Sequence, residues 1–146
     1  MNPKKPGKRE ISKALRDLEK KDTFCRRIVS KKYGWKQHSF INWKVEGGYY
    51  FYLRHLNCYS GAFLYVKPLY IDDLWWDIFE ISSNKKEPMS LRGNGTFSLD
   101  GVRILNTPEL FDIRTDERGS EYELEKIQKY SDEDIEKIWD NVFQQF

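Results

Sequence analysis

Two stretches rich in aromatic and β-branched residues, 40–45 and 49–59, stand on either side of a glycine pair, Gly47-Gly48. The side chains of each stretch can alternate between two faces, as they do along a β-strand. A glycine pair between two such stretches is typical of a tight hairpin turn, because glycine adopts the positive φ angles that the turn needs. The sequence therefore predicts an antiparallel hairpin in the first half of the chain.

A third strand is expected at 62–71, after a turn at Ser60-Gly61. It completes a three-stranded antiparallel meander. Pro68 lies within this stretch, and proline has no amide hydrogen to donate to a strand ladder. We therefore expect an edge position or a β-bulge at Pro68.

Apolar residues recur at helical spacing from Ile11 to Val29 and predict an N-terminal helix before the meander. The pattern is interrupted near Asp22, which is expected either to cap a second helix or to face solvent. Gly34 is the expected end of this helical region, because glycine fits the left-handed conformation that follows many helices.

The strongest helix signal lies at the other end of the chain. Ser131 and Asp134 have the spacing of a capping box, with aspartate in place of the usual glutamate or glutamine. Residues 135–146 then carry apolar side chains on one helical face. This amphipathic C-terminal helix is expected to pack on the sheet. Residues 121–130 fit either another helical turn or a strand.

A short central helix is expected at 74–81, because Asp72-Asp73 favours a helix N-terminus. Its predicted packing face consists of Leu74, Trp75, Ile78 and Phe79. Beyond it, the turn signals Asn94-Gly95 and Asp100-Gly101 predict hairpins that join short strands at 89–91, 97–99 and 102–105.

These features together predict an α+β fold with an N-terminal helix, an antiparallel meander, a short central helix and a C-terminal helix. We expect about five to six strands in total. Residues 1–9 are expected to form a disordered basic lead-in, and residues 10–146 to form a single α+β domain.

The composition indicates a folded cytoplasmic protein. Aromatic residues make up 16% of the chain, whereas disordered chains are poor in aromatics. No stretch of about 18 apolar residues is present, and the first nine residues lack the apolar block of a signal peptide. Cys25 and Cys58 are therefore expected to be reduced thiols, and no membrane partner is expected.

The net charge of +2 conceals a strong asymmetry along the chain. Residues 1–44 carry a net charge of +10, residues 45–106 carry −1, and residues 107–146 carry −7. A basic segment of this kind fits nucleic acid or an acidic partner. Alternatively, the basic and acidic ends lie together in the fold and neutralise each other.

No catalytic or metal-binding motif is apparent. The run Arg92-Gly93-Asn94-Gly95 lacks the residues that complete a phosphate-binding loop, and no serine elbow is present. Four potential zinc ligands are Cys25, His38, His55 and Cys58, but their spacing does not make them converge. We therefore expect no catalytic residues, no metal site and no cofactor.

One candidate binding surface lies on the predicted central helix. Asp73, Trp76, Asp77 and Glu80 share one helical face, opposite the predicted packing face. A tryptophan left outward among carboxylates is typical of an anchor for a protein partner. The alternatives are that the acids are simply solvated and that the C-terminal helix covers Trp76.

A second candidate surface lies on the sheet. If Tyr49, Phe51 and Leu53 face the core, then Tyr50, Tyr52 and Arg54 face the other way. Aromatic and cationic side chains on one surface can bind a partner or stack nucleic-acid bases. Alternatively, both faces of the sheet are covered, one by the N-terminal helix and the other by the C-terminal helix.

The favoured function is a non-enzymatic protein-binding module, similar in its mode of action to an immunity or adaptor protein. A first alternative is a nucleic-acid-binding domain that uses the sheet aromatics and a basic set made of Arg26, Arg27, Lys31, Lys32 and Lys44. A second alternative is a small metal-dependent enzyme that uses Asp72, Asp73 and Asp77. A homo-oligomer is also compatible with the sequence, through an exposed edge at the third strand.

Overall fold

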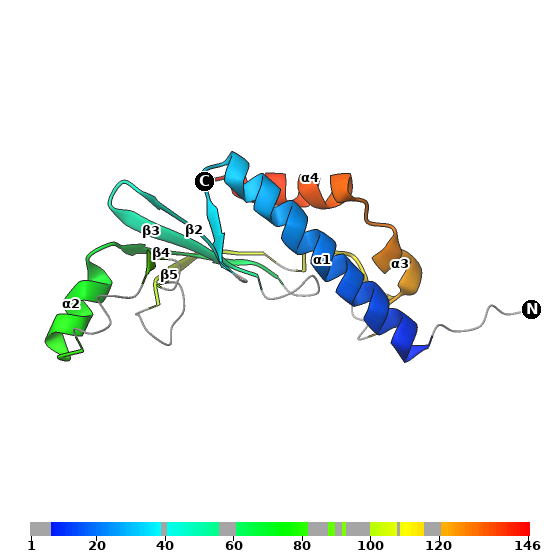
Figure 1. Ribbon diagram of the computed structural model, residues 1–146, viewed down its shortest axis with the longest axis horizontal. Helices are drawn as coiled ribbons and strands as arrows, with labels where there is room; N and C mark the ends of the chain where they lie inside the picture. The colour runs from blue at the N-terminus through cyan, green and yellow to red at the C-terminus, as the bar shows by residue number, and fades with distance from the viewer. Residues whose placement is uncertain are drawn as a thin grey trace, which may run out of the picture.

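The protein is described by a computed structural model in which residues 7–38, 41–55, 61–81, 88–89, 92, 100–107, 109–115 and 121–146 are placed. Within these ranges the elements are α1 (Lys8–Lys32), β1 (Lys36–His38), β2 (Ile41–Glu46), β3 (Tyr49–Arg54), β4 (Phe63–Pro68), α2 (Ile71–Ile78), β5 (Val102–Asn106), α3 (Leu124–Gln128) and α4 (Asp132–Phe143) (Figure 1). The α+β fold predicted from the sequence is therefore confirmed.

Five strands form one antiparallel sheet in the order β1-β2-β3-β4-β5. Each strand pairs with the next one along the chain, so the predicted meander is confirmed and is longer than three strands. The strand predicted at 102–105 is β5. The strand predicted at 97–99 and most of the one predicted at 89–91 lie outside the described residues.

The hairpin between β2 and β3 forms because of its two glycines. Glu46 pairs with Tyr49 across the turn, which leaves Gly47 and Gly48 as the connection. Their φ angles are 59° and 81°, and both fall in the left-handed region that side chains disfavour. Positive φ at both central residues gives the turn a twist that matches the strands on either side. The predicted hairpin is confirmed.

The prediction for Pro68 is confirmed at the residue itself, which pairs with β3 alone, but not for the strand as a whole. β4 lies between β3 and β5, so it is an interior strand, and the β-bulge lies between Leu64 and Tyr65. Pro68 is tolerated because it is the last residue of β4, beyond Val66, where the pairing with β5 stops. The third strand therefore offers no exposed edge for self-association.

The predicted interruption of the first helix is also absent, because α1 runs without a break from Lys8 to Lys32. Asp22 is buried in the middle of this helix. Its carboxylate accepts hydrogen bonds from Arg26 Nη1 at 3.1 Å and from Trp139 Nε1 at 2.6 Å, and it lies 3.1 Å from His55 Nε2. These partners satisfy the buried carboxylate, so Asp22 neither faces solvent nor caps a second helix.

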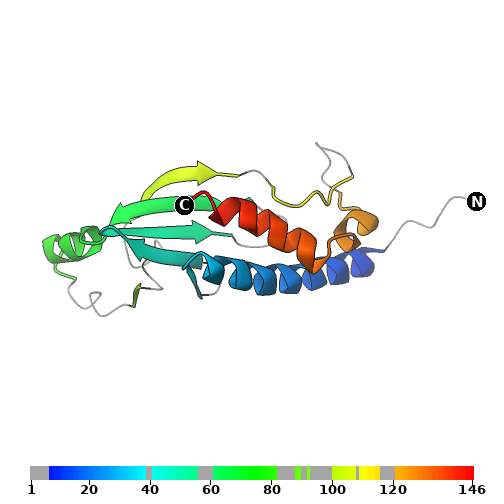
Figure 2. The same cartoon turned by 90° about the horizontal axis from the view of Figure 1, so that it is seen from above.

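The C-terminal helix α4 begins as predicted, with Ser131 and Asp134 forming a capping box. It lies alongside α1, and the two helices pack on one face of the sheet at the end far from the β2–β3 hairpin, with most of α1 extending beyond the sheet (Figures 1 and 2). The end of the chain reaches the sheet, where Phe143 packs against Trp35 and Lys44 Nζ donates to the carbonyl oxygen of Phe146. The undecided segment before it contains the short helix α3.

Both faces of the sheet carry buried side chains. Leu53 and Leu64 face a core shared with α1 and α4. Ile41, Tyr50 and Tyr52 form a second cluster on the opposite face, with Met89 packed against it. The predicted alternation of side chains along β3 is therefore confirmed. The alternative in which the N- and C-terminal helices cover one face each is wrong, because both helices pack on the same face, and Val45 and Tyr49 near the hairpin stay exposed.

The buried carboxylate of Asp22 makes a direct test of this architecture. We expect Asp22→Ala to lower the free energy of unfolding by about 3–5 kcal/mol, because it leaves the buried guanidinium of Arg26 without its ion-pair partner. Urea unfolding followed by far-UV circular dichroism measures the change. Asp17→Ala, at an exposed position of the same helix, should change it by less than about 0.5 kcal/mol. Equal effects of the two substitutions would contradict the arrangement.

Candidate functional site

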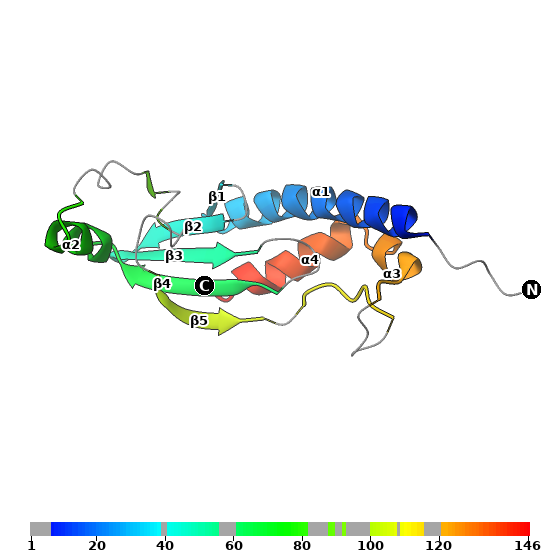
Figure 3. The same ribbon diagram turned by 90° about the horizontal axis from the view of Figure 1, so that it is seen from below.

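The helix α2 stands at one end of the molecule, beyond the end of the sheet (Figures 1 and 3). Two of its side chains turn inward and hold it there. Asp72 is buried and forms a 3.0 Å ion pair with Lys67 of β4. Trp76, one helical turn later, is fully buried at 0% exposure beneath Arg92, whose guanidinium carbon lies 5.0 Å from the ring centre. These contacts fix which face of α2 meets the body of the protein.

The ion pair at the base of α2 is held in a dry environment. Burial lowers the pKa of Lys67, although the Asp72 carboxylate opposes that effect. Lys67 Nζ also donates to the backbone carbonyl of Arg92 at 2.6 Å, and Arg92 Nη1 lies 3.8 Å from Asp73. Because several charged groups share the same contacts, α2 is held by a network of interactions and not by one bond.

The opposite face of α2 is apolar and exposed. Tyr70, Leu74 and Ile78 are spaced four residues apart, so they lie in one row along the helix. Ile78 is 64% exposed and Phe79 is 61% exposed. The ring of Phe79 lies 5.6 Å from that of Trp75. We call Tyr70, Leu74 and Ile78, together with the exposed C-cap residue Phe79 at the end of the helix, the α2 apolar face.

The sequence prediction for this helix is therefore wrong in orientation. The predicted packing residues Leu74, Ile78 and Phe79 are exposed and Trp75 is half-buried, whereas Trp76, expected outward, is buried. Asp77 and Glu80 are exposed as expected. Both faces of the helix carry large apolar side chains, so periodicity alone cannot decide which one is buried. The ion pair between Asp72 and Lys67 decides it, and this pair comes from a contact between two elements.

Carboxylates border the α2 apolar face. Asp77 and Glu80 are exposed, Asp73 is partly exposed, and the last turn of the helix contains no basic residue. Glu80 has a φ angle of 58°, in the left-handed region. It occupies the turn after the helix, where Glu80 N and Ile81 N donate to the carbonyls of Asp77 and Trp76 and where glycine is usual. The apolar face thus has an acidic rim.

Of the sheet residues proposed as a binding surface, Tyr50 and Tyr52 are buried and Arg54 is half-buried. Tyr50 donates its hydroxyl to the carbonyl of Met89 at 2.8 Å, and the amide of Gly101 donates to the Tyr52 hydroxyl at 2.6 Å. Burial raises the pKa of Tyr52 to about 12. Arg54 forms a 2.6 Å ion pair with Asp100. The expected outward aromatic surface is therefore absent, because backbone segments that are distant in sequence cover it.

The five basic residues proposed for nucleic-acid binding do not form one patch. Arg26 is buried against Asp22, Lys44 bonds the carbonyl of Phe146, and Lys32 lies 3.2 Å from Asp140. Arg27 and Lys31 face solvent. The pair between Lys32 and Asp140 shows that the basic first helix and the acidic last helix partly neutralise each other.

The proposed metal-binding carboxylates are divided between two faces of α2. Asp72 turns inward to Lys67, whereas Asp77 turns outward. Among the described residues, no group of three or more His, Cys, Asp and Glu side chains could hold a metal ion. The arrangement does not support the metal-dependent enzyme, since its three carboxylates do not converge.

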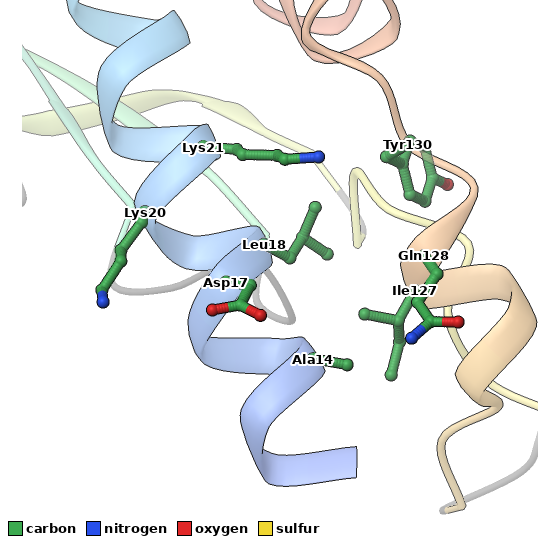
Figure 4. A pocket seen from close by; sticks show the side chains of 8 residues that line it. All are labelled: Ala14, Asp17, Leu18, Lys20, Lys21, Ile127, Gln128 and Tyr130. Atoms are coloured by element: carbon green, nitrogen blue, oxygen red, sulfur yellow. The ribbon is translucent and has the colours of Figure 1, made fainter. Parts of the chain in front are cut away.

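Several hollows lie beside α1, and the two described next contain no histidine or cysteine in their described lining. A cavity of about 420 Å³ opens between α1 and α3, over Leu18 and Ile127, and its described lining contains Asp17 as the one carboxylate (Figure 4). A hollow of about 820 Å³ lies near Ile11 and Leu124, and its polar lining includes Ser12, Glu121 and Glu123.

No model of a known protein family matches the chain, and neither a curated protein nor a solved structure matches it. Among the described residues, no helix has both the length and the apolar character needed to cross a membrane.

The orientation of α2 can be tested with two substitutions on the same helix. We expect Trp76→Ala to lower the free energy of unfolding by about 3–5 kcal/mol, because it empties a fully buried site. Ile78→Ala should change it by less than about 0.5 kcal/mol, because Ile78 faces solvent. Urea unfolding of both variants makes the comparison. A larger loss from Ile78→Ala would mean that the helix packs through its other face.

Cys25 provides a test by thiol reactivity. Its burial raises the pKa to about 11, with a further contribution from the charges of Asp132 and Glu136. In a Cys58→Ser background, we expect iodoacetamide at about pH 8 to alkylate Cys25 at least about 100-fold more slowly than it alkylates glutathione, because the thiolate is the reactive form. The rate should recover in urea. Rapid alkylation of the folded protein would contradict the burial of Cys25.

Proposed function

We propose that this chain is a non-enzymatic protein-binding module, and that α2 docks a basic, apolar segment of another protein. The observation that carries the proposal is the α2 apolar face, which remains exposed while Trp76 and Asp72 hold the helix in place. Exposed clusters of large apolar side chains are typical of interaction surfaces. The proposal retains an immunity- or adaptor-like role, in which binding itself is the activity.

The chemistry of the partner follows from the acidic rim. Asp77 and Glu80 lie beside Ile78 and Phe79, so a partner gains most if it brings cations around an apolar centre. The same carboxylates repel the phosphates of nucleic acids and the surfaces of anionic membranes. A cationic amphipathic helix is the simplest segment with the required chemistry.

The anchoring of α2 supports high affinity for such a segment. A docking helix that is already held by buried contacts loses little conformational freedom on binding. The aromatic pair Trp75 and Phe79 adds rigid contact area at low entropic cost. The proposal also assigns the protein to the cytoplasm, where the thiol of Cys25 stays reduced.

Two designed peptides test the proposal. One is a helical peptide of about 18 residues, or five turns, with leucines on one face and lysines on the other, and the second has glutamate in place of lysine. By fluorescence anisotropy, we expect the protein to prefer the cationic peptide. Leu74→Ser/Ile78→Ser should weaken that binding by at least about tenfold, because two apolar contacts are lost.

A matched control uses exposed apolar residues elsewhere. Val102→Ser/Ile104→Ser on β5 also removes two exposed aliphatic side chains, and it should leave the affinity within about twofold. Equal binding of both peptides, or equal losses from the two double variants, would overturn the proposal. A dimer of the wild type in analytical ultracentrifugation that Leu74→Ser/Ile78→Ser abolishes would instead make α2 an interface between copies of this chain.

A further inference from the structure

One side of α1 carries a straight row of basic residues that the fold does not use. The row contains Arg9, Lys13, Arg16, Lys20, Phe24, Arg27 and Lys31. Successive members are three or four residues apart, so they lie within an arc of about 80° on the helix and extend about 33 Å along its axis. All seven side chains are exposed. We call this row the α1 basic stripe.

The packing of α1 turns this stripe outward. Asp22, Arg26 and Val29 are buried on the side of the helix that meets the rest of the protein. The helices α3 and α4 lie on that side, as Figures 2 and 3 show. Within the described residues, the cations of α1 that form ion pairs are Arg26 and Lys32, and neither belongs to the stripe. The acidic residues of α1 lie outside the row, although Asp17 and Glu19 border it on its two sides.

We propose that the α1 basic stripe binds the phosphate backbone of a nucleic acid. The phosphates of a nucleic acid form a regular row of negative charges, and each cation that meets one releases a counterion. Six cations at intervals of about 5–10 Å along a rigid rod match such a row. Phe24, 60% exposed between Lys20 and Arg27, adds an aromatic ring on which an unpaired base can stack.

Other anionic partners fit the stripe less well. A helix that lies on a membrane needs a broad apolar face toward the lipid, but Phe24 and the neighbouring Ile28 are the exposed apolar residues at this side of α1. A protein interface needs a buried apolar centre, and here a single phenylalanine stands among six cations. The inference differs from the nucleic-acid alternative drawn from the sequence, since the stripe excludes the buried Arg26 and the sheet tyrosines.

The stripe also stands apart from the α2 apolar face. α2 lies beyond one end of the sheet, whereas most of α1 extends beyond the other end (Figure 1). The acidic rim of α2 therefore does not repel phosphates that bind at the stripe. The two proposals depend on different residues, and either one can fail without the other.

Fluorescence anisotropy with labelled nucleic acids tests the inference. The probes are a duplex of about 20 base pairs, longer than the stripe at about 3.4 Å per base pair, and a single strand of the same length. Titrations across a salt series give the slope of log K against log salt. We expect a slope of about −5 for the duplex if each of the six cations neutralises one phosphate.

Two triple variants identify the surface. Lys13→Gln/Lys20→Gln/Lys31→Gln removes three cations of the stripe, and glutamine preserves helix propensity. Arg103→Gln/Lys129→Gln/Lys137→Gln removes three exposed cations elsewhere and lowers the net charge of +2 equally. We expect the first variant to flatten the slope by about 3 and the second to change it by less than about 1. Leu74→Ser/Ile78→Ser should bind nucleic acid like the wild type.

Several outcomes would overturn the inference. These are the absence of binding to both probes at low salt, equal losses in the two triple variants, and tighter binding to polyglutamate or to anionic phosphatidylserine vesicles than to nucleic acid. Phe24→Ala separates the two nucleic-acid forms. A selective loss of affinity for the single strand would support stacking of an unpaired base on Phe24. Unchanged affinity for the duplex would support contact of the stripe with the duplex backbone alone.

Discussion

A single buried carboxylate fixes the orientation of the first helix against the rest of this protein. Asp22 lies in the middle of α1 and meets Trp139 of α4 and His55 at the end of β3, together with Arg26 of its own helix. Because a buried charge must keep its partners, these contacts fix the rotation of α1 about its axis. That rotation decides which α1 side chains enter the core and which ones line the basic stripe.

A buried charge pair also fixes the orientation of α2, at the opposite end of the molecule. The pair of Lys67 and Asp72 is buried, and it fixes the rotation of α2 as Asp22 fixes that of α1. In both helices, a charge pair inside determines the character of the surface outside. The outer surface of α1 is basic and that of α2 is acidic and apolar, so the chain presents two chemically distinct ends.

Local signals in the sequence predicted local structure well. Gly47-Gly48 and the pair of Ser131 and Asp134 act through neighbouring backbone groups, so the hairpin and the capping box could be identified without tertiary knowledge. Asp22 and Trp76 were misjudged because their environment comes from residues over a hundred positions away or from another element. The basic stripe was detectable from its spacing of three and four residues, but net charge by segment hides a row on one helical face.

Glu80 gives the edge of the α2 apolar face an unusual character. Its backbone has a φ angle of 58°, a conformation that is energetically unfavourable for an L-residue with a Cβ atom but not for glycine. Glycine at this position would relax the turn and remove one carboxylate of the rim at the same time. Selection for thermal stability would therefore favour glycine at position 80, whereas selection for partner binding would favour glutamate. The residue found at this position in evolved variants would show which selection had acted.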